Sequence, residues 1–232
     1  MAFVVAPEAS AGAVNCFRLT WDGAASLVAT SALELVADAS QNYCLGLGKI
    51  SATKVLAGYT VSTNTQQWVE IVTSGDPPTA SGTPLRLSSA SPSTLKRGIA
   101  MNADGTAAVM VGVVSGAQYL EIIDTSGSTP AHLGRIRASD QSGGGDTEII
   151  QLPSGDFLFR HIVGQGSCDL YGWNNNSPYL KKAQLPVFDA LNATDVVWGV
   201  SNTSLGVALE PTTTNFPALS AGEIWSRLIE SE

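Results

Sequence analysis

Charged side chains are scarce in this sequence: Asp, Glu, Lys and Arg together make up 14% of its 232 residues. Lysine and arginine number 12 against 20 acidic residues, which leaves a formal net charge of −8 at pH 7. Such a chain repels phosphate groups, so the sequence excludes a nucleic acid or an anionic membrane surface as the main partner. The low charge and the 44% content of hydrophobic residues also exclude a disordered chain.

Cysteines and long apolar runs are scarce as well. The three cysteines, Cys16, Cys44 and Cys168, have no zinc-motif spacing and no even count for a disulfide framework. We therefore expect buried, reduced cysteines and a chain made in a reducing cytoplasm. Apolar runs stay far below the ~20 residues of a membrane helix, and residues 1–8 lack the basic start of a secretory signal. The sequence thus predicts neither membrane insertion nor a signal peptide.

The sequence does contain an internal repeat. Its clearest mark is an aromatic residue followed by x-Glu-Ile, at 68–71 (WVEI) and again 51 residues later at 119–122 (YLEI). A third copy puts Tyr171 in the aromatic position, 52 residues after the second. Weaker copies of the first hairpin occur at 17–29 and 196–209. Self-similarity at a fixed period indicates a repeat architecture.

Each copy contains four short strand candidates joined by turns. Asp22-Gly23, Asp104-Gly105 and Ser154-Gly155 occupy tight turns in which a positive φ favours glycine. No stretch shows a convincing helical period. Repeated four-stranded units of about 45 to 50 residues are typical of a β-propeller. We therefore predict an all-β fold, a β-propeller of five blades that average about 46 residues each; a β-sandwich is the alternative.

We expect one domain over residues 1–232, with a strand at 3–6 that closes the ring as part of the last blade. The predicted blades span approximately 12–43, 44–94, 95–146, 147–195 and 196–232. The aromatic residues of the third strands, Trp68, Tyr119 and Tyr171, are expected to pack between blades.

The segments 50–59 (ISATKVLAGY) and 68–75 (WVEIVTSG) resemble repeats of phage fibres, spikes and related bacterial surface proteins. Those repeats read Ala-Leu-Asp-Ser-Thr-Lys-Val-Leu-Val-x-Tyr, followed by a strand that ends in Val-Ser-Gly, and they build propeller-like domains. The resemblance covers residues 45–200 and implies a propeller used for binding or assembly. The second copy departs from the pattern at 102–106 (NADGT), a commoner hairpin turn. The family motif contains no catalytic residue, so none is carried over.

Few residues are candidates for catalysis or metal binding. His132 and His161 lie 29 residues apart, with no Cys, His or carboxylate at ligand spacing, so we predict neither a zinc site nor a catalytic triad. Glu70 and Glu121 occupy equivalent repeat positions, which favours a structural role. A glycosidase would instead need carboxylates about 5–9.5 Å apart on one cavity.

The loop at 140–146 (DQSGGGD) matches neither a P-loop nor a dinucleotide fingerprint. A loop between blades is the prediction. A calcium ion held by Asp140 and Asp146 is the alternative, although the spacing is not that of an EF-hand. We expect no metal and no cofactor.

Residues 171–179 (YGWNNNSPY) are the best candidates for ligand binding. Aromatic rings stack on the apolar faces of sugars, and asparagine amides both donate to and accept from hydroxyls. The candidate glycan-binding residues are Tyr171, Trp173, Asn174, Asn175, Asn176 and Tyr179. The alternative is an ordinary Asn-rich turn with one aromatic side chain between blades.

Repeat and resemblance together predict a non-enzymatic structural and attachment component of a virus particle, most simply a phage tail, fibre or head-surface protein. We expect it to dock on other virion proteins, to form a homo-oligomer and to bind a host surface glycan. A free lectin is the second hypothesis, but its pocket residues should recur, and residues 76–78 (DPP) differ from 174–176 (NNN). A propeller glycoside hydrolase is the third, and it needs carboxylates from three blades around the central channel.

Overall fold

The computed structural model describes residues 2–7, 13–21, 27–37, 44–61, 66–87, 96–114, 117–139, 147–160, 167–186, 195–200, 204–210 and 229–230. These residues form strands and turns, with no helix among them. A search of this part of the chain finds no helix long and apolar enough to cross a membrane.

The strands form five sheets, named here in chain order. Sheet 1 contains β1 (Ala2–Pro7), β2 (Val14–Trp21), β3 (Leu27–Ala29) and β4 (Leu33–Val36). Sheet 2 contains β5 (Cys44–Lys49), β6 (Lys54–Val61), β7 (Gln66–Thr73) and β8 (Thr79–Arg86). Sheet 3 contains β10 (Ala100–Met101), β11 (Ala107–Val114), β12 (Ala117–Asp124) and β13 (Ala131–Ser139). Sheet 4 contains β14 (Thr147–Gln151), β15 (Phe157–Arg160), β16 (Ser167–Asn174) and β17 (Ser177–Pro186), with β9 (Lys96–Arg97) at its edge, and sheet 5 contains β18 (Asp195–Val200), β19 (Ser204–Glu210) and β20 (Ile229–Glu230).

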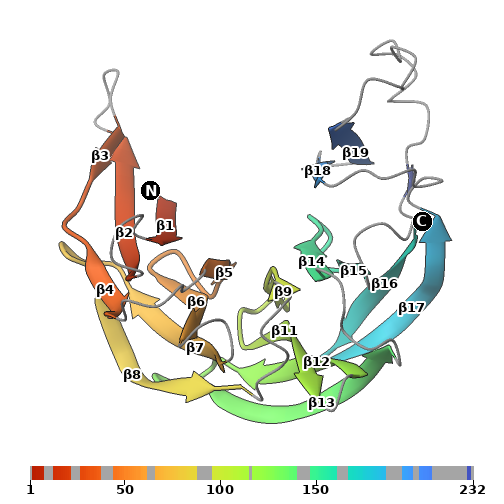
Figure 1. Cartoon of the computed structure of the whole chain (residues 1–232), viewed down its shortest axis with the longest axis horizontal. Helices are drawn as coiled ribbons and strands as arrows, with labels where there is room; N and C mark the ends of the chain where they lie inside the picture. Colours follow the sequence, from red (N-terminus) through yellow and green to blue (C-terminus); the bar gives the residue numbers. More distant parts are fainter. Residues whose placement is uncertain are drawn as a thin grey trace.

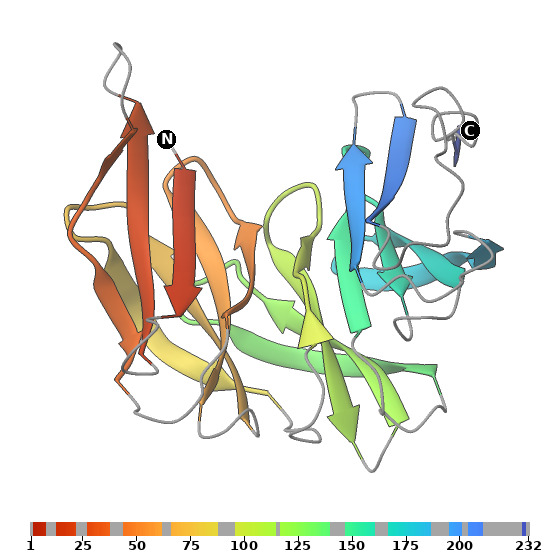
Figure 2. The same ribbon diagram turned by 45° about the horizontal axis from the view of Figure 1, so that its top comes forward.

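The sheets follow one another in chain order around an arc, with sheet 1 at one end and sheet 5 at the other (Figures 1 and 2). In sheets 2, 3 and 4 the strands pair antiparallel with their neighbours in sequence. The first strand of each of these sheets lies on the inside of the arc, and the last strand, β8, β13 or β17, lies on the outside (Figure 1). This radial arrangement of meandering sheets is that of a β-propeller, as the repeat predicted. The number of blades in the ring stays a prediction.

The N-terminal strand lies in the first sheet, which corrects one expectation. Residues 3–6 were predicted to complete the last blade, but β1 pairs antiparallel with β2, with Val5 opposite Cys16. Only residues 8–13 separate the two strands. Strands joined by a short connection normally pair with each other as antiparallel neighbours. Sheet 5 takes its third strand from β20 instead.

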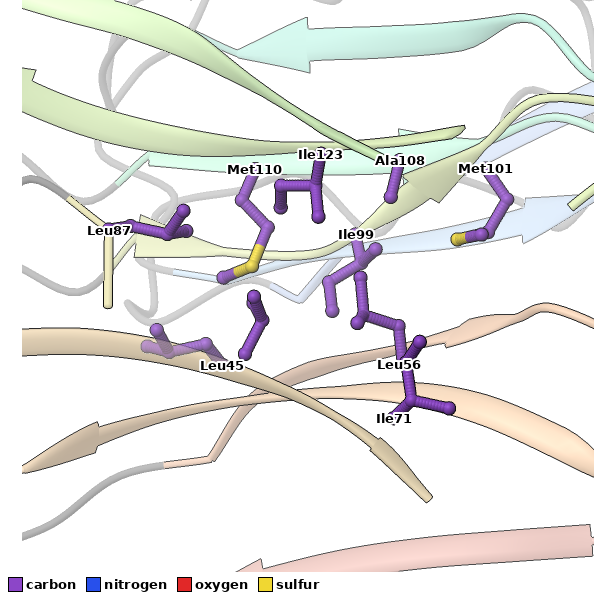
Figure 3. Packing of buried hydrophobic residues seen from close by; sticks show 10 residues of the cluster. Leu45, Leu56, Ile71, Leu87, Ile99, Met101, Ala108, Met110 and Ile123 are labelled. Carbon is purple, nitrogen blue, oxygen red and sulfur yellow. The ribbon is translucent and has the colours of Figure 1, made fainter. Parts of the chain in front are cut away.

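The hydrophobic core lies between neighbouring sheets. Leu56 and Ile71 of sheet 2 belong to one buried cluster with Ile99, Met101 and Met110 from the segment of sheet 3 (Figure 3). A second cluster joins sheets 3 and 4, and a third joins sheets 1 and 2. Strands such as β6 are buried along almost their whole length because both of their faces are covered. That burial explains why β6 and β11 are continuous apolar runs and do not alternate.

The inner turns use glycine as predicted. Gly105 has a φ of 68° and Gly155 a φ of 89°, both in the left-handed region. The backbone N–H of Gly105 donates to the carbonyl of Asn102, and that of Gly155 donates to the carbonyl of Leu152. The third predicted turn glycine, Gly23, lies outside the described residues.

Polar contacts join sheets 3 and 4 along the inner edge. β9, which precedes sheet 3 in the chain, pairs parallel with β14 of sheet 4. The side chain of Gln151 bonds to the backbone of Met101 twice: Oε1 accepts from N at 3.1 Å, and Nε2 donates to O at 2.8 Å. The Gln151 amide thus forms the pair of backbone hydrogen bonds that a neighbouring strand would otherwise form with Met101.

Candidate functional site

The six candidate glycan-binding residues belong to the β16–β17 hairpin but do not share one surface. Tyr171 is 4% exposed, and its ring stacks on Phe157 with 5.3 Å between centroids. Trp173 packs against the same cluster between sheets 3 and 4. Because side chains alternate along a strand, Asn174 and Tyr179 lie on the opposite face of the hairpin, where both are exposed. Tyr171 is therefore a core residue whose ring a sugar does not reach.

Asn175 and Asn176 form the hairpin turn and contact sheet 3. Asn175 has a φ of 53°, a left-handed conformation that asparagine tolerates. Oδ1 of Asn176 accepts hydrogen bonds from Nδ2 of Asn102 and from Oγ1 of Thr106, both at 3.0 Å. Asn102 is only 5% exposed, and its own Oδ1 accepts from the backbone N–H groups of Thr106 and Ala107. The two turn asparagines thus have structural contacts between sheets.

The side chain of Tyr179 is exposed to solvent and lies next to Gly172. The residue is 47% exposed, and it lies directly opposite Gly172 on the neighbouring strand. A Cβ at Gly172 would lie 3.2 Å from Cε1 of Tyr179 and 2.8 Å from Cδ of Lys181. Nζ of Lys181 donates to Oδ2 of Asp156 at 2.8 Å, and this hydrogen bond raises the pKa of Lys181. We call Tyr179, Lys181, Asp156 and Asn174 the Tyr179 surface.

Two of these four residues are absent from the sequence-based prediction. Asp156 and Lys181 lie 25 positions apart, and only the pairing of β15, β16 and β17 brings them together. Gly172 was the one indication of this surface in the sequence, because the absence of a side chain there leaves room for Lys181, Asp156 and Tyr179. Trp173, a predicted glycan contact, lies on the core side of the hairpin.

Strand register aligns the third repeat differently from the sequence. Tyr171 pairs with Phe157 on the strand after the inner turn, as Ile123 pairs with Ala108. Tyr171 is therefore the counterpart of Ile123 and not of Tyr119, because the third unit is shorter than the second. A buried acidic residue stands two positions before Ile123 and two positions before Tyr171, and sheet 2 has one at the equivalent place. These residues are Glu121, Asp169 and Glu70.

Glu70 and Glu121 each have partners in their own sheet. The hydroxyl of Tyr59 donates to Oε2 of Glu70 at 3.2 Å. Burial raises the pKa of Glu70, and the hydrogen bond from Tyr59 opposes that shift. Oε2 of Glu121 lies 2.6 Å from Nε2 of His132 and 3.6 Å from Nε of Arg135. Glu70 shares its face with residues packed on sheet 1, and Glu121 shares its face with residues packed on sheet 2. They do not face one cavity as a glycosidase pair does.

The contact between Glu121 and His132 was not predicted from sequence spacing. The two residues are 11 positions apart on β12 and β13, which is outside the short spacings of ligand motifs. The signal was the hairpin itself, because its turn at 125–130 brings the two strands side by side. His161 and the loop at 140–146 lie outside the described residues. Within the described ranges, no three His, Cys, Asp or Glu side chains gather as a metal site requires.

The described cysteine side chains are inert. Cys16 and Cys168 are buried, and neither is in a disulfide. Burial, with a smaller contribution from the charge of Asp169, raises the pKa of Cys168 to about 12. Its thiol therefore stays protonated at neutral pH, as expected of a buried structural cysteine.

Comparisons with known proteins agree with this architecture. No protein-family model matches the sequence, and no curated protein matches it. Among solved structures, a candidate 6-phosphogluconolactonase from Bacteroides fragilis has a TM-score of 0.56 at 15% identity, over 85% of this chain and 58% of that one. A candidate 6-phosphogluconolactonase from Bacteroides uniformis has a TM-score of 0.51 at 14% identity, over 87% and 62%. The chain is a β-propeller. At these identities the likeness shows the fold alone, and the chain spans about three fifths of each of those proteins.

Proposed function

We propose that this propeller is a non-enzymatic attachment module of a phage particle and that it binds a host glycan at the Tyr179 surface. The half-exposed ring of Tyr179, beside the Lys181–Asp156 ion pair, is the observation that carries the binding proposal. The resemblance of residues 50–59 and 68–75 to repeats of phage fibres and spikes supports the virion role. In that role the chain docks on other virion proteins and forms an oligomer.

The chemistry of the Tyr179 surface suits a sugar. The ring of Tyr179 offers an apolar face to sugar C–H groups. The carboxylate of Asp156 accepts more than one hydrogen bond, and the ammonium of Lys181 has three donors, so both can bind hydroxyls while paired with each other. Asn174 adds an amide that donates and accepts. Stacking combined with mixed donors and acceptors is what a polyhydroxylated ligand requires.

Removing the Tyr179 ring is expected to abolish most of the glycan binding. Tyr179→Ala should lower the affinity for a neutral bacterial surface oligosaccharide at least about tenfold, because the stacking surface is lost. An oligosaccharide array selects the ligand, and isothermal titration measures the dissociation constant. Leu180→Ala is the matched control, since Leu180 is 49% exposed but pairs with Tyr171 on the other side of the strand. An equal loss in both variants, or no binding by the unaltered chain, contradicts the glycan proposal.

The virion role has its own test. In a cryo-electron microscopy reconstruction of native particles, we expect this chain at a fixed, symmetric position. It should bury more than about 1,000 Å² against other virion proteins, as specific interfaces do. Particles that lack the chain would refute the virion role and leave the binding result standing by itself.

A further inference from the structure

The side chains of the Tyr179 surface surround the position of Gly172. Three of their atoms lie within 3.2 Å of the point that a Cβ at Gly172 would occupy: Cδ of Lys181, Oδ1 of Asp156 and Cε1 of Tyr179. The strand that carries Gly172, β16, lies between β15 and β17 in sheet 4, so the two neighbouring strands bring these side chains together. An aromatic edge, a carboxylate oxygen and a lysine side chain therefore lie next to one another.

The ion pair on this surface is ordered before any ligand binds. The carbonyl of Asp156 accepts from the N–H of Leu152 at 2.8 Å, and the N–H of Asp156 donates to Oγ of Ser154 at 3.3 Å. Oδ2 of Asp156 accepts from Nζ of Lys181 at 2.8 Å. The side chains of Lys181 and Asp156 are still 36% and 22% exposed. Part of the ordering that binding requires is thus already in place, and both groups remain open to a ligand.

The pair presents a hydrogen-bond donor and a hydrogen-bond acceptor side by side. The ammonium of Lys181 has three N–H groups and uses one of them for Asp156, whose carboxylate accepts further bonds. This hydrogen bond raises the pKa of Lys181, so the ammonium is charged at neutral pH. Two gauche hydroxyls on adjacent sugar carbons have their oxygens about a hydrogen-bond length apart, as Nζ and Oδ2 are at 2.8 Å. Such a pair of hydroxyls can therefore bind both groups at once.

The ring of Tyr179 sets which part of a sugar meets the pair. A pyranose that stacks on an aromatic face turns its C–H groups to the ring, and its hydroxyls lie around its rim. The ring atom nearest to Gly172 is Cε1, on the edge of the Tyr179 ring, and Oδ1 of Asp156 lies next to the same point. A stacked sugar thus has one side of its rim beside the ion pair.

We propose that the Tyr179 surface selects a hexopyranose with two free hydroxyls on adjacent carbons. The Lys181 ammonium donates to one hydroxyl, and the Asp156 carboxylate accepts from the next. This inference rests on the glycan binding proposed above and names the part of the sugar that is recognised. Charge-assisted hydrogen bonds are about twice as strong as neutral ones, so a sugar that lacks either hydroxyl should bind clearly more weakly.

The test measures competition with small sugars for the oligosaccharide that the array selects. The probes are the methyl pyranosides of glucose, mannose and galactose, followed by the four monodeoxy derivatives of the best competitor, which lack the hydroxyl at the second, third, fourth or sixth carbon. Each derivative keeps its ring and hence its stacking on Tyr179. We expect two derivatives altered at adjacent ring carbons to compete about tenfold less well. The other two should stay within about threefold.

Two variants assign the two hydroxyls. Lys181→Met should lower the affinity about tenfold and make the chain insensitive to the loss of one of the two hydroxyls, because its partner is gone. Asp156→Ala should do the same for the adjacent hydroxyl. Lys182→Met is the matched control: Lys182 is exposed and follows Lys181 in the chain, but the ammonium that binds Asp156 is that of Lys181. We expect the control to stay within twofold.

The outcomes separate this inference from folding defects and from the proposed function. Thermal melting of the variants should match the unaltered chain to within a few degrees, because surface ion pairs contribute little to stability. If the oligosaccharide binds but no methyl glycoside competes, or no two adjacent hydroxyls matter, the glycan proposal stands and the inference is wrong. An equal loss in Lys181→Met and Lys182→Met also overturns it. If the unaltered chain binds no oligosaccharide, the glycan proposal fails first and the inference fails with it.

Discussion

Gly98→Ala is expected to lower the free energy of unfolding by about 3 kcal/mol or more. A Cβ at this position would lie 1.9 Å from the carbonyl oxygen of Ile149, and Gly98 has a φ of 92° that disfavours any side chain. Its backbone N–H donates to the carbonyl of Leu45 at 2.7 Å. Gly98 is therefore held between sheets 2 and 4, and the clash is relieved only by moving backbone. Urea denaturation of the full chain measures the loss.

Gly155→Ala separates the two causes of that loss. Gly155 has nearly the same φ, 89°, but nothing lies within 4 Å of the position that a Cβ would take. We expect a loss of about 1 kcal/mol, which reflects the left-handed backbone alone. If both variants lose the same free energy, the contact with Ile149 contributes nothing to the effect.

Asn102→Ala should lower the free energy of unfolding by about 2 to 3 kcal/mol. Asn102 accepts hydrogen bonds from two backbone N–H groups of its own turn and donates to Asn176 on the neighbouring sheet. The variant leaves these groups without their partner in a site that is 5% exposed. Urea denaturation measures this loss as well.

Asn102→Asp divides the effect between the turn and the sheet contact. Aspartate keeps an oxygen for the two backbone N–H groups but lacks the amide donor to Asn176 and to the carbonyl of Asn175. We expect a loss of about 1 kcal/mol, close to the value of one hydrogen bond. If this variant loses as much as Asn102→Ala, the contacts of the Asn102 amide carry the whole effect and the turn contacts of its oxygen carry none.

The propeller was predictable because its determinants are local. Glycines at positive φ, such as Gly105 and Gly155, mark the inner turns, and short apolar runs between such turns give four strands per repeat. The position of β1 was not predictable from the repeat. Its pairing depends on the short connection to β2, and the comparison of repeats did not include that connection.

Which side chains of the candidate site share one surface was not predictable from the sequence. The aromatic and amide residues of 171–179 all belong to the β16–β17 hairpin. The side of the sheet that each residue faces follows the alternation of side chains along its strand, and a search for ligand-binding residue types alone does not take this alternation into account. Asp156 and Lys181 meet only through the pairing of three strands, and His132 meets Glu121 only through a hairpin register. Searches for motif spacing within a short window do not find such pairs.

The polar contacts between sheets 3 and 4 limit how this protein can be taken apart. They join residues 50 to 74 positions apart, through Gln151 and through Asn102. A sheet 3 moved alone into another protein would lose the acceptors that Asn175 and Asn176 supply to the Asn102 amide and keep only Oγ1 of Thr106, at a cost of about 1 kcal/mol for each lost hydrogen bond. For recombination or domain grafting, the exchangeable unit of this propeller is therefore a pair of adjacent sheets and not the single sequence repeat.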